Sequence, residues 1–209
     1  MTMDQSVMRS PLGPSWTPGH HGTVATGDDG SAEAGIRALH APGLLVVEIA
    51  ALPGKGTAMR TAVKKGLKLD LGDGSPAASL PNAVCSGPDR YLLTGFDLAA
   101  VKAAVGDLGL AVDQSSGRVR LSIDGADVPG LLAKSCPLDL AKWPVGMSQA
   151  SHFLHISCTW YRRSETGFDL YIGRSFARSA AEWLIESTAE FGVEILRLQL
   201  TSWTGRVKI

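Results

Sequence analysis

One order of predicted elements occurs twice in the chain, and this repetition constrains the fold more than any other feature of the sequence. Residues 64–71 read KKGLKLDL and residues 133–140 read AKSCPLDL, each with a lysine near its start and a Leu-Asp-Leu ending. Each octamer lies at the end of a predicted helix and in the turn that leaves it. We therefore expect residues 43–115 and 118–200 to form two superposable units with the order β-α-β-β-α-β.

The first unit begins with the apolar, β-branched run LLVVEIAAL at 44–52, which predicts a buried strand. Residues 56–67 follow with apolar side chains four positions apart, the spacing of an amphipathic helix. The stretches NAVCSG and RYLLTGF predict two short strands joined by the turn SGPD. Asp97 is placed to cap the helix DLAAVKAAVGDLG, and LAVDQS closes the unit as a strand.

The second unit begins at RVRLSIDG (118–125), whose alternating apolar residues predict a half-buried strand. A short helix over ADVPGLLAKSC has Pro129 near its first turn, where a missing N–H costs little. We expect SQASHFLHISCTWYRR (148–163) to be one long strand that pairs with GFDLYIGRS. A helix from Ser175 to a C-cap at Gly192 and a strand over VEILRLQL complete the unit.

The first part of the chain differs from both units in composition. Residues 1–42 are rich in Gly, Pro, Ser, Thr, His and Asp and show no sustained period of 2 or 3.6. We expect an extended or poorly ordered N-terminal arm there, with order beginning near Gly43. The predicted organisation is an α+β fold with this arm, a first α/β half at 43–116 and a second α/β half at 117–209.

A small apolar cluster lies near the start of the arm, on a proline-rich stretch that favours an extended conformation. Aromatic anchors contribute strongly to interfaces, so MRSPLGPSW is a candidate docking peptide. A mobile tail with one incidental tryptophan is the alternative. The candidate partner-binding residues are Met8, Arg9, Pro11, Leu12 and Trp16.

Charge and cysteine content exclude several classes of protein. Twenty Lys and Arg residues balance twenty Asp and Glu residues, so we expect neither nucleic acid nor an anionic membrane as a partner. Three widely spaced cysteines fit a reducing compartment better than a disulfide framework. The N-terminus lacks an apolar signal core, and the apolar run at 43–52 is far shorter than the roughly 20 residues of a membrane span. We expect a cytoplasmic protein.

The sequence shows no recognisable catalytic motif. No G-x-G-x-x-G follows the first strand, and PGKGT at 53–57 lacks the spacing of a phosphate-binding loop. On one long strand, His152 and Cys158 would face one way and His155 the other, which favours half-buried strand positions over a metal site. Cys136 borders a proline after a predicted helix, where packing is favoured over reactivity. We expect no catalytic, cofactor-binding or metal-binding residues in this chain.

Several segments in order resemble the gamma subunit family of heterotetrameric sarcosine oxidases. They are DQSSGRVRLSIDGADVPGLLAKSCPLDL, WPVG and FDLYIGRSFARSAAEWLIESTAEFG, and the early RSPL also fits. The resemblance covers residues 90–192 well and 1–89 loosely. It implies the aminomethyltransferase-like, folate-binding fold, which is built from tandem halves. In folate-binding relatives an aspartate of the Asp-x-Ser region contributes to the site, whereas for Asp113 here we favour a turn or cap between the halves.

The resemblance also implies a role in the oxidative demethylation of sarcosine to glycine and hydrogen peroxide, with formaldehyde or methylene-tetrahydrofolate as the one-carbon product. It places FAD, FMN, NAD, tetrahydrofolate and zinc in partner subunits and none in this chain. The implied partners are the alpha, beta and delta subunits, chiefly alpha, and the implied role is structural. The alternatives are the same role in an oxidase for another N-methyl amino acid, or a stand-alone folate-binding protein of this fold, for which a KGCYxGQ segment is missing.

Overall fold

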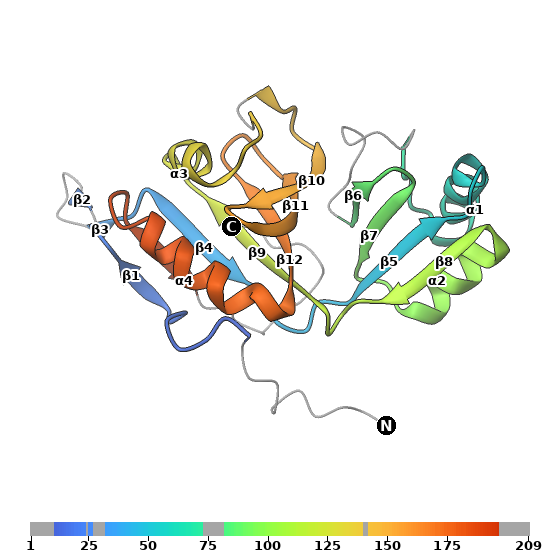
Figure 1. Cartoon of the computed structure of the whole chain (residues 1–209), viewed down its shortest axis with the longest axis horizontal. Helices are drawn as coiled ribbons and strands as arrows, with labels where there is room; N and C mark the ends of the chain where they lie inside the picture. The colour runs from blue at the N-terminus through green and yellow to red at the C-terminus, as the bar shows by residue number, and fades with distance from the viewer. Residues whose placement is uncertain (1–10, 24, 27–31, 73–81, 140–141, 197–209) are drawn as a thin grey trace.

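Two β-sheets lie side by side in the computed structural model, and helices pack on each of them (Figure 1). The structure describes residues 11–23, 25–26, 32–72, 82–139 and 142–196. We call the four-stranded sheet with helices α1 and α2 the small half. The large half is the seven-stranded sheet with helices α3 and α4. A separate two-stranded ribbon pairs β2 (Ala25–Thr26) with β3 (Ala32–Glu33).

The small half has every element in the predicted order. Its sheet has the strand order β6-β7-β5-β8, with each neighbouring pair antiparallel. This places the two strands that flank each helix parallel to one another, with a third strand between them. The elements are β5 (Val46–Ala51), α1 (Gly56–Leu67), β6 (Ala83–Gly87), β7 (Arg90–Thr94), α2 (Leu98–Val105), the 3-10 turn η3 (Gly106–Leu108) and β8 (Gly109–Asp113).

Local chemistry explains the helices of the small half. The Asp97 carboxylate accepts a hydrogen bond from the Ala100 backbone N–H at 2.8 Å, which is the predicted N-cap of α2. Helix α1 ends where Lys68 adopts the left-handed conformation with φ 57°. Both helices cover one face of the sheet, and Met59 and Val101 are fully buried in the core between helices and strands.

The large half has the strand order β1-β13-β4-β9-β12-β11-β10. Strand β13 runs parallel to β4, and the other neighbouring pairs are antiparallel. Its elements are β1 (Gly19–His21), β4 (Ile36–His40), β9 (Arg118–Asp124), α3 (Val128–Ser135), β10 (Ser148–Phe153), β11 (Ile156–Arg162), β12 (Phe168–Gly173), the 3-10 turn η5 (Arg174–Phe176), α4 (Ala177–Ser187) and β13 (Val193–Leu196).

The aromatic centre of the large half lies beneath its helices. Trp160 and Phe153 are fully buried and meet edge to face with ring centroids 5.9 Å apart. Phe153 makes a second edge-to-face contact with Trp183 of α4, at 5.5 Å. Alternate residues of β12 point into this core, since Phe168 and Leu170 belong to the same cluster.

The N-terminal segment is more ordered than the predicted arm. Strand β4 lies inside the larger sheet, between β9 and β13, and Ile36 and Ala38 are buried in its core. The prediction that order begins near Gly43 is therefore wrong. The reason is that IRALH is too short to show a period by itself, and its burial depends on two strands that lie far away in the sequence.

The segment 148–163 does not form the single long strand that was predicted. It folds as a hairpin, β10 and β11, with a two-residue turn at Leu154 and His155. Leu154 has φ 55°, and Phe153 pairs with Ile156 across the turn. The sequence gives no Asn-Gly or Asp-Gly signal there, so the turn was not visible.

The end of α4 differs from the prediction, whereas the two octamers lie where they were expected. Helix α4 ends at Ser187, earlier than predicted, and Gly192 with φ 69° instead leads into β13. Both octamers span the end of the first helix of their half and the turn after it, as predicted, although residue 140 lies outside the described part. Because the large half also contains β1, β4 and an extra hairpin strand, the two halves are not simple copies.

Candidate functional site

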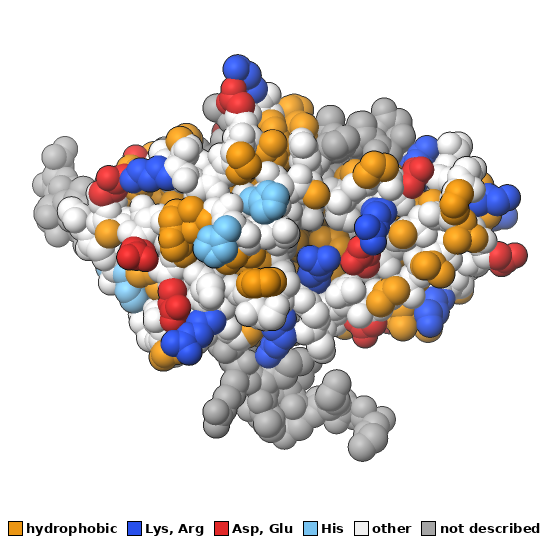
Figure 2. Space-filling model, in the orientation of Figure 1, with side chains coloured by type: hydrophobic (Ala, Val, Ile, Leu, Met, Phe, Trp, Pro, Cys, Tyr) orange, Lys and Arg blue, Asp and Glu red, His pale blue; other side chains and the backbone are white. Residues whose placement is uncertain are grey.

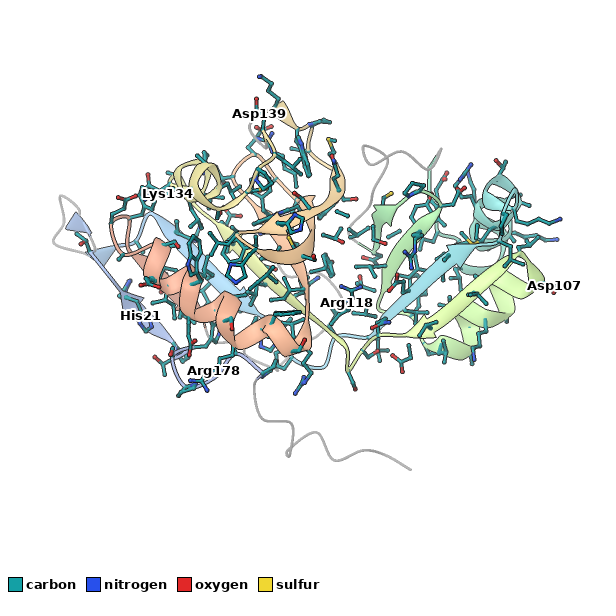
Figure 3. All side chains as sticks on the ribbon, in the orientation of Figure 1. His21, Asp107, Arg118, Lys134, Asp139 and Arg178 are labelled. Atoms are coloured by element: carbon teal, nitrogen blue, oxygen red, sulfur yellow. The ribbon has the colours of Figure 1, made fainter. Side chains whose placement is uncertain are left out.

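The described part of the N-terminal arm lies against the large half. Leu12 is fully buried within its core cluster, and Trp16 is half-buried and packs on the same cluster. Gly13 has φ 76°, and a Cβ there would lie 3.0 Å from the Arg178 side chain at the start of α4 (Figure 3). This part of the arm is thus tied to its own chain.

These placements change the interpretation of the candidate docking residues. The prediction of an exposed cluster that includes Leu12 is wrong, because that side chain belongs to the core of its own chain. Pro11 is half-buried, while Met8 and Arg9 lie outside the described residues. Partner binding by the arm stays a prediction, and it now concerns the residues that precede Leu12 and the exposed part of Trp16.

The seam is our name for the contact between the two halves. Its apolar part combines Leu44, Val46, Val84 and Leu92 of the small half with Tyr161 and Tyr171 of the large half. Strand β10 packs along β6, and the Ser148 hydroxyl donates to the Cys85 carbonyl at 3.0 Å. The halves are therefore joined by buried surface as well as by the chain.

An ion pair joins the two halves at the seam. The carboxylate of Glu48 in β5 lies 3.3 Å from Arg90 and 3.5 Å from Arg118 in β9. Figure 2 shows basic and acidic side chains between the halves, where Figure 3 labels Arg118. Glu48 is mostly buried, so solvent screens these pairs less than it screens surface pairs.

Asp113 has the structural role that we favoured. Its carboxylate accepts a hydrogen bond from the Ser115 backbone N–H at 2.8 Å, and hydrogen bonds from Ser115 hold the pKa of Asp113 below its usual value. The Ser115 hydroxyl in turn accepts from the Val46 backbone N–H at 3.0 Å. This turn therefore fixes the passage from the small half to the large half.

A small cavity opens where the two connections between the halves cross. We call it the seam cavity, and it has a volume of about 40 Å³. Burial first, and then the positive charges of Arg174 and Arg120, lower the pKa of His40 to about 4. The basic side chains that line the cavity are His40, Arg118, Arg120 and Arg174.

A larger cavity, of about 330 Å³, lies beside the end of α3, and the second octamer supplies five of its lining residues. Arg162 lines it too, but its guanidinium donates to the main-chain carbonyls of Trp143, Ser164 and Glu165. Burial raises the pKa of the Cys136 thiol. The cavity therefore offers a protonated thiol and a guanidinium already bound to carbonyls, which is poor equipment for catalysis.

The cysteines and the hairpin histidines do not converge. All three cysteines are buried and none forms a disulfide, and burial raises their pKa values, so the thiols stay protonated at neutral pH. His152 is exposed and pairs with Ser157, whereas buried Cys158 pairs with Ser151. The prediction that His152 and Cys158 share a face is wrong, because the turn reverses the strand between them.

The described ranges contain neither a metal cluster nor a membrane span. No three His, Cys, Asp or Glu side chains in them are grouped closely enough to hold a metal ion. No helix in them is both long and apolar enough to cross a membrane.

An exposed apolar strip lies on β8, the edge strand of the small sheet. Leu110 and Val112 are 63% and 51% exposed, and they point away from the face that α1 and α2 cover. The strand contains neither proline nor lysine, residues that commonly protect sheet edges. Our sequence reasoning missed this strip, although GLAVD has apolar residues on both faces, a pattern that favours a covered strand.

Structural comparison defines the class of the fold. The chain matches a chain of the heterotetrameric sarcosine oxidase from Corynebacterium sp. U-96, solved in complex with pyrrole 2-carboxylate, with a TM-score of 0.67. The match covers 88% of this chain and 96% of the other at 21% identity. An aminomethyltransferase T of the glycine cleavage system from Bartonella henselae matches with a TM-score of 0.55 and 16% identity, over 78% of this chain and 48% of the other. The fold is thus an α+β fold shared with aminomethyltransferases.

Sequence comparison identifies the family within this class. The model of the family described as sarcosine oxidase, gamma subunit family matches residues 84–190. A sarcosine oxidase subunit gamma from Corynebacterium sp. (strain P-1) is 32% identical over 71% of this chain and 77% of its own length. Another from Arthrobacter sp. is 30% identical over 69% of this chain and 76% of its own length. The chain belongs to the sarcosine oxidase gamma subunit family.

Proposed function

We propose that this chain is the gamma subunit of a heterotetrameric sarcosine oxidase, which demethylates sarcosine oxidatively to glycine and hydrogen peroxide. The methyl carbon leaves as formaldehyde or as methylene-tetrahydrofolate. The observation that carries the proposal is family membership, supported by a fold match that spans nearly the whole of a chain from such an oxidase.

Within this assembly the chain has a structural role. Buried, protonated thiols and a cavity arginine bound to carbonyls support a role without bond-making chemistry. The redox and one-carbon cofactors, namely FAD, FMN, NAD, tetrahydrofolate and zinc, belong to the partner subunits. The complex works in the cytoplasm.

The alpha subunit is the main partner in this proposal, with beta and delta in the same complex. Two surfaces are proposed for docking: the start of the arm, with Met8, Arg9, Pro11 and the exposed part of Trp16, and the β8 strip. The strip supports this role because exposed apolar edge strands in soluble proteins are commonly covered by a partner.

Affinity purification of the tagged chain from its own cells tests the proposal. We expect three partner chains to co-elute with it. The eluate should show a flavin absorption spectrum and should produce hydrogen peroxide when sarcosine is added. Peroxide from another N-methyl amino acid but not from sarcosine would assign the complex to a related oxidase. A colourless chain that elutes alone contradicts the proposal.

Replacing Leu110 and Val112 by Ser sharpens the same experiment. Both side chains are exposed, so the isolated chain should fold normally while co-elution of its partners falls. The matched control replaces exposed Thr61 and Lys65 of α1, which lie on the helical side of the small half. Undiminished co-elution of the strip variant would remove β8 from the docking surface.

A further inference from the structure

The seam cavity concentrates positive charge. It lies between the connection from β4 to β5 and the connection from β8 to β9. His40, Arg118, Arg120 and Arg174 line it, and none of the described residues that line it is acidic. Burial and the neighbouring arginine charges lower the pKa of His40 to about 4, so the imidazole is neutral at pH 7 and has an N–H to donate.

Arg120 has a buried nitrogen without a hydrogen-bond acceptor among the described residues. It stands beside Tyr171 in the antiparallel pair of β9 and β12. The Arg120 Nε and the Tyr171 hydroxyl are both buried, and each lacks a hydrogen-bond partner among the described residues. The Tyr171 hydroxyl can accept as well as donate and is a neighbour of the Arg120 guanidinium, but the geometry leaves the Arg120 Nε–H without an acceptor. A buried charged donor without an acceptor destabilises the folded chain, and a bound anion would remove this penalty by accepting the hydrogen bond.

Two carboxylates near the cavity are paired with other arginines. Glu48 is shared between Arg90 and Arg118, at 3.3 Å and 3.5 Å. Asp169 lies 3.4 Å from Arg163. Within the described ranges Arg120 makes no ion pair, although Asp169 is near enough for its negative charge to raise the pKa of Arg120.

The size of the cavity limits the ligand. One water needs roughly 10–15 Å³ of such space, and the seam cavity offers about 40 Å³. That is enough for a carboxylate group and far too little for a nucleotide. A planar guanidinium is well suited to bind a carboxylate with two hydrogen bonds.

We propose that the seam cavity binds one carboxylate group, with Arg120 and Arg174 as its cationic contacts and neutral His40 as a further donor. The carboxylate comes either from a small free acid or from an acidic side chain of a neighbouring subunit. Carboxylate binding concerns the chain itself, and only the neighbouring subunit as its source rests on the proposed oxidase assembly.

Nuclear magnetic resonance of the full-length chain tests the proposal, with sodium acetate as the probe and sodium chloride at equal ionic strength as the reference. We expect acetate to shift the Arg120 Nε–H resonance saturably. The His40 pKa should rise from about 4 in acetate, because a bound negative charge favours the imidazolium form. The wild-type chain gives both readouts, so neither depends on a variant that folds.

Variants identify the groups involved. Arg120→Met should weaken acetate binding by about tenfold or more, and Arg174→Met should weaken it as well. Arg37→Met is the matched control, because Arg37 is exposed on β4 and does not line the cavity. No saturable shift in the wild type, or an equal affinity in Arg120→Met, overturns the proposal.

The assembled complex distinguishes the two sources. If the carboxylate is free, the assembled chain should still bind acetate saturably. If a neighbouring subunit supplies it, acetate should have no effect and the His40 pKa should already be raised. An assembled chain that neither binds acetate nor has a raised His40 pKa contradicts both versions.

Discussion

The small half and the large half differ in where their strands come from. All four strands of the small half lie within residues 46–113. The large half takes β4 and β1 from the N-terminal segment and pairs them with β13 near the other end of the chain. Local patterns describe the first kind of assembly well, and they miss strands whose partners are distant in the sequence.

Removing residues 1–42 should produce the largest difference in folding between the two halves. Without β4, the strands β9 and β13 lose their shared neighbour, so the large half should not fold. Trp16 is removed with this segment and the four remaining tryptophans all follow residue 116, so tryptophan fluorescence does not report on the small half. We expect no cooperative transition by fluorescence in urea, while circular dichroism retains helical signal from the small half.

Single substitutions in β4 refine that test. Ile36→Ala should lower the free energy of unfolding by about 2–5 kcal/mol, the usual cost of truncating a buried isoleucine. Arg37→Ala, at the exposed neighbouring position, should change it by less than about 0.5 kcal/mol. If the two variants are equally stable, β4 is not an integral strand.

Met59→Ala applies the same kind of change to the small half. The side chain is fully buried between α1 and its sheet, so we expect a loss of about 2–5 kcal/mol. Hydrogen exchange should accelerate in α1 more than in α4, because the contacts removed are local. Lys65→Ala on the exposed side of α1 is the control. Equal acceleration in both halves would show that the seam makes them one cooperative unit.

Acid should weaken the seam through His40. Its folded pKa of about 4 lies below the usual 6.5, so the unfolded chain binds the proton more tightly and stability falls as pH drops from 6.5 toward 4. The expected loss is about 1–2 kcal/mol by pH 5, allowing for partial exposure. Urea unfolding at pH 7 and pH 5 measures it. His40→Gln should remove this part of the slope, and the substitution His152→Gln on exposed β10 should keep it.

Helix capping gives the smallest difference between the halves. Asp97 caps α2 with its side chain, whereas α4 starts from the turn η5 and has no side-chain cap. Asp97→Ala should therefore cost about 1 kcal/mol. Ser175→Ala, just before α4, should cost less than about 0.5 kcal/mol. Thermal unfolding of the two variants measures both values, and equal losses would contradict the assigned cap.

Sequence patterns predicted the elements whose evidence is local. Helix α1 has the predicted bounds, and Asp97 caps α2 because an Asp before an apolar period is a local signal. The turn at Leu154 was missed because it uses a left-handed non-glycine residue, which has no strong sequence signature. The seam cavity was also invisible, since His40 and Arg120 lie 80 positions apart and meet through tertiary structure.

The pairing of β4 with β13 also sets an order of events during synthesis. The small half has all its strands once residue 113 has been made, and it can fold while the rest of the chain is still being translated. Strand β4 emerges before the small half, yet its parallel partner follows about 150 residues later, roughly 8–30 s at 5–20 residues per second. During that interval Ile36 and Ala38 have no completed sheet to enter, because β9 can pair with only one edge of β4, so the newborn chain carries an apolar strand that chaperones are suited to protect.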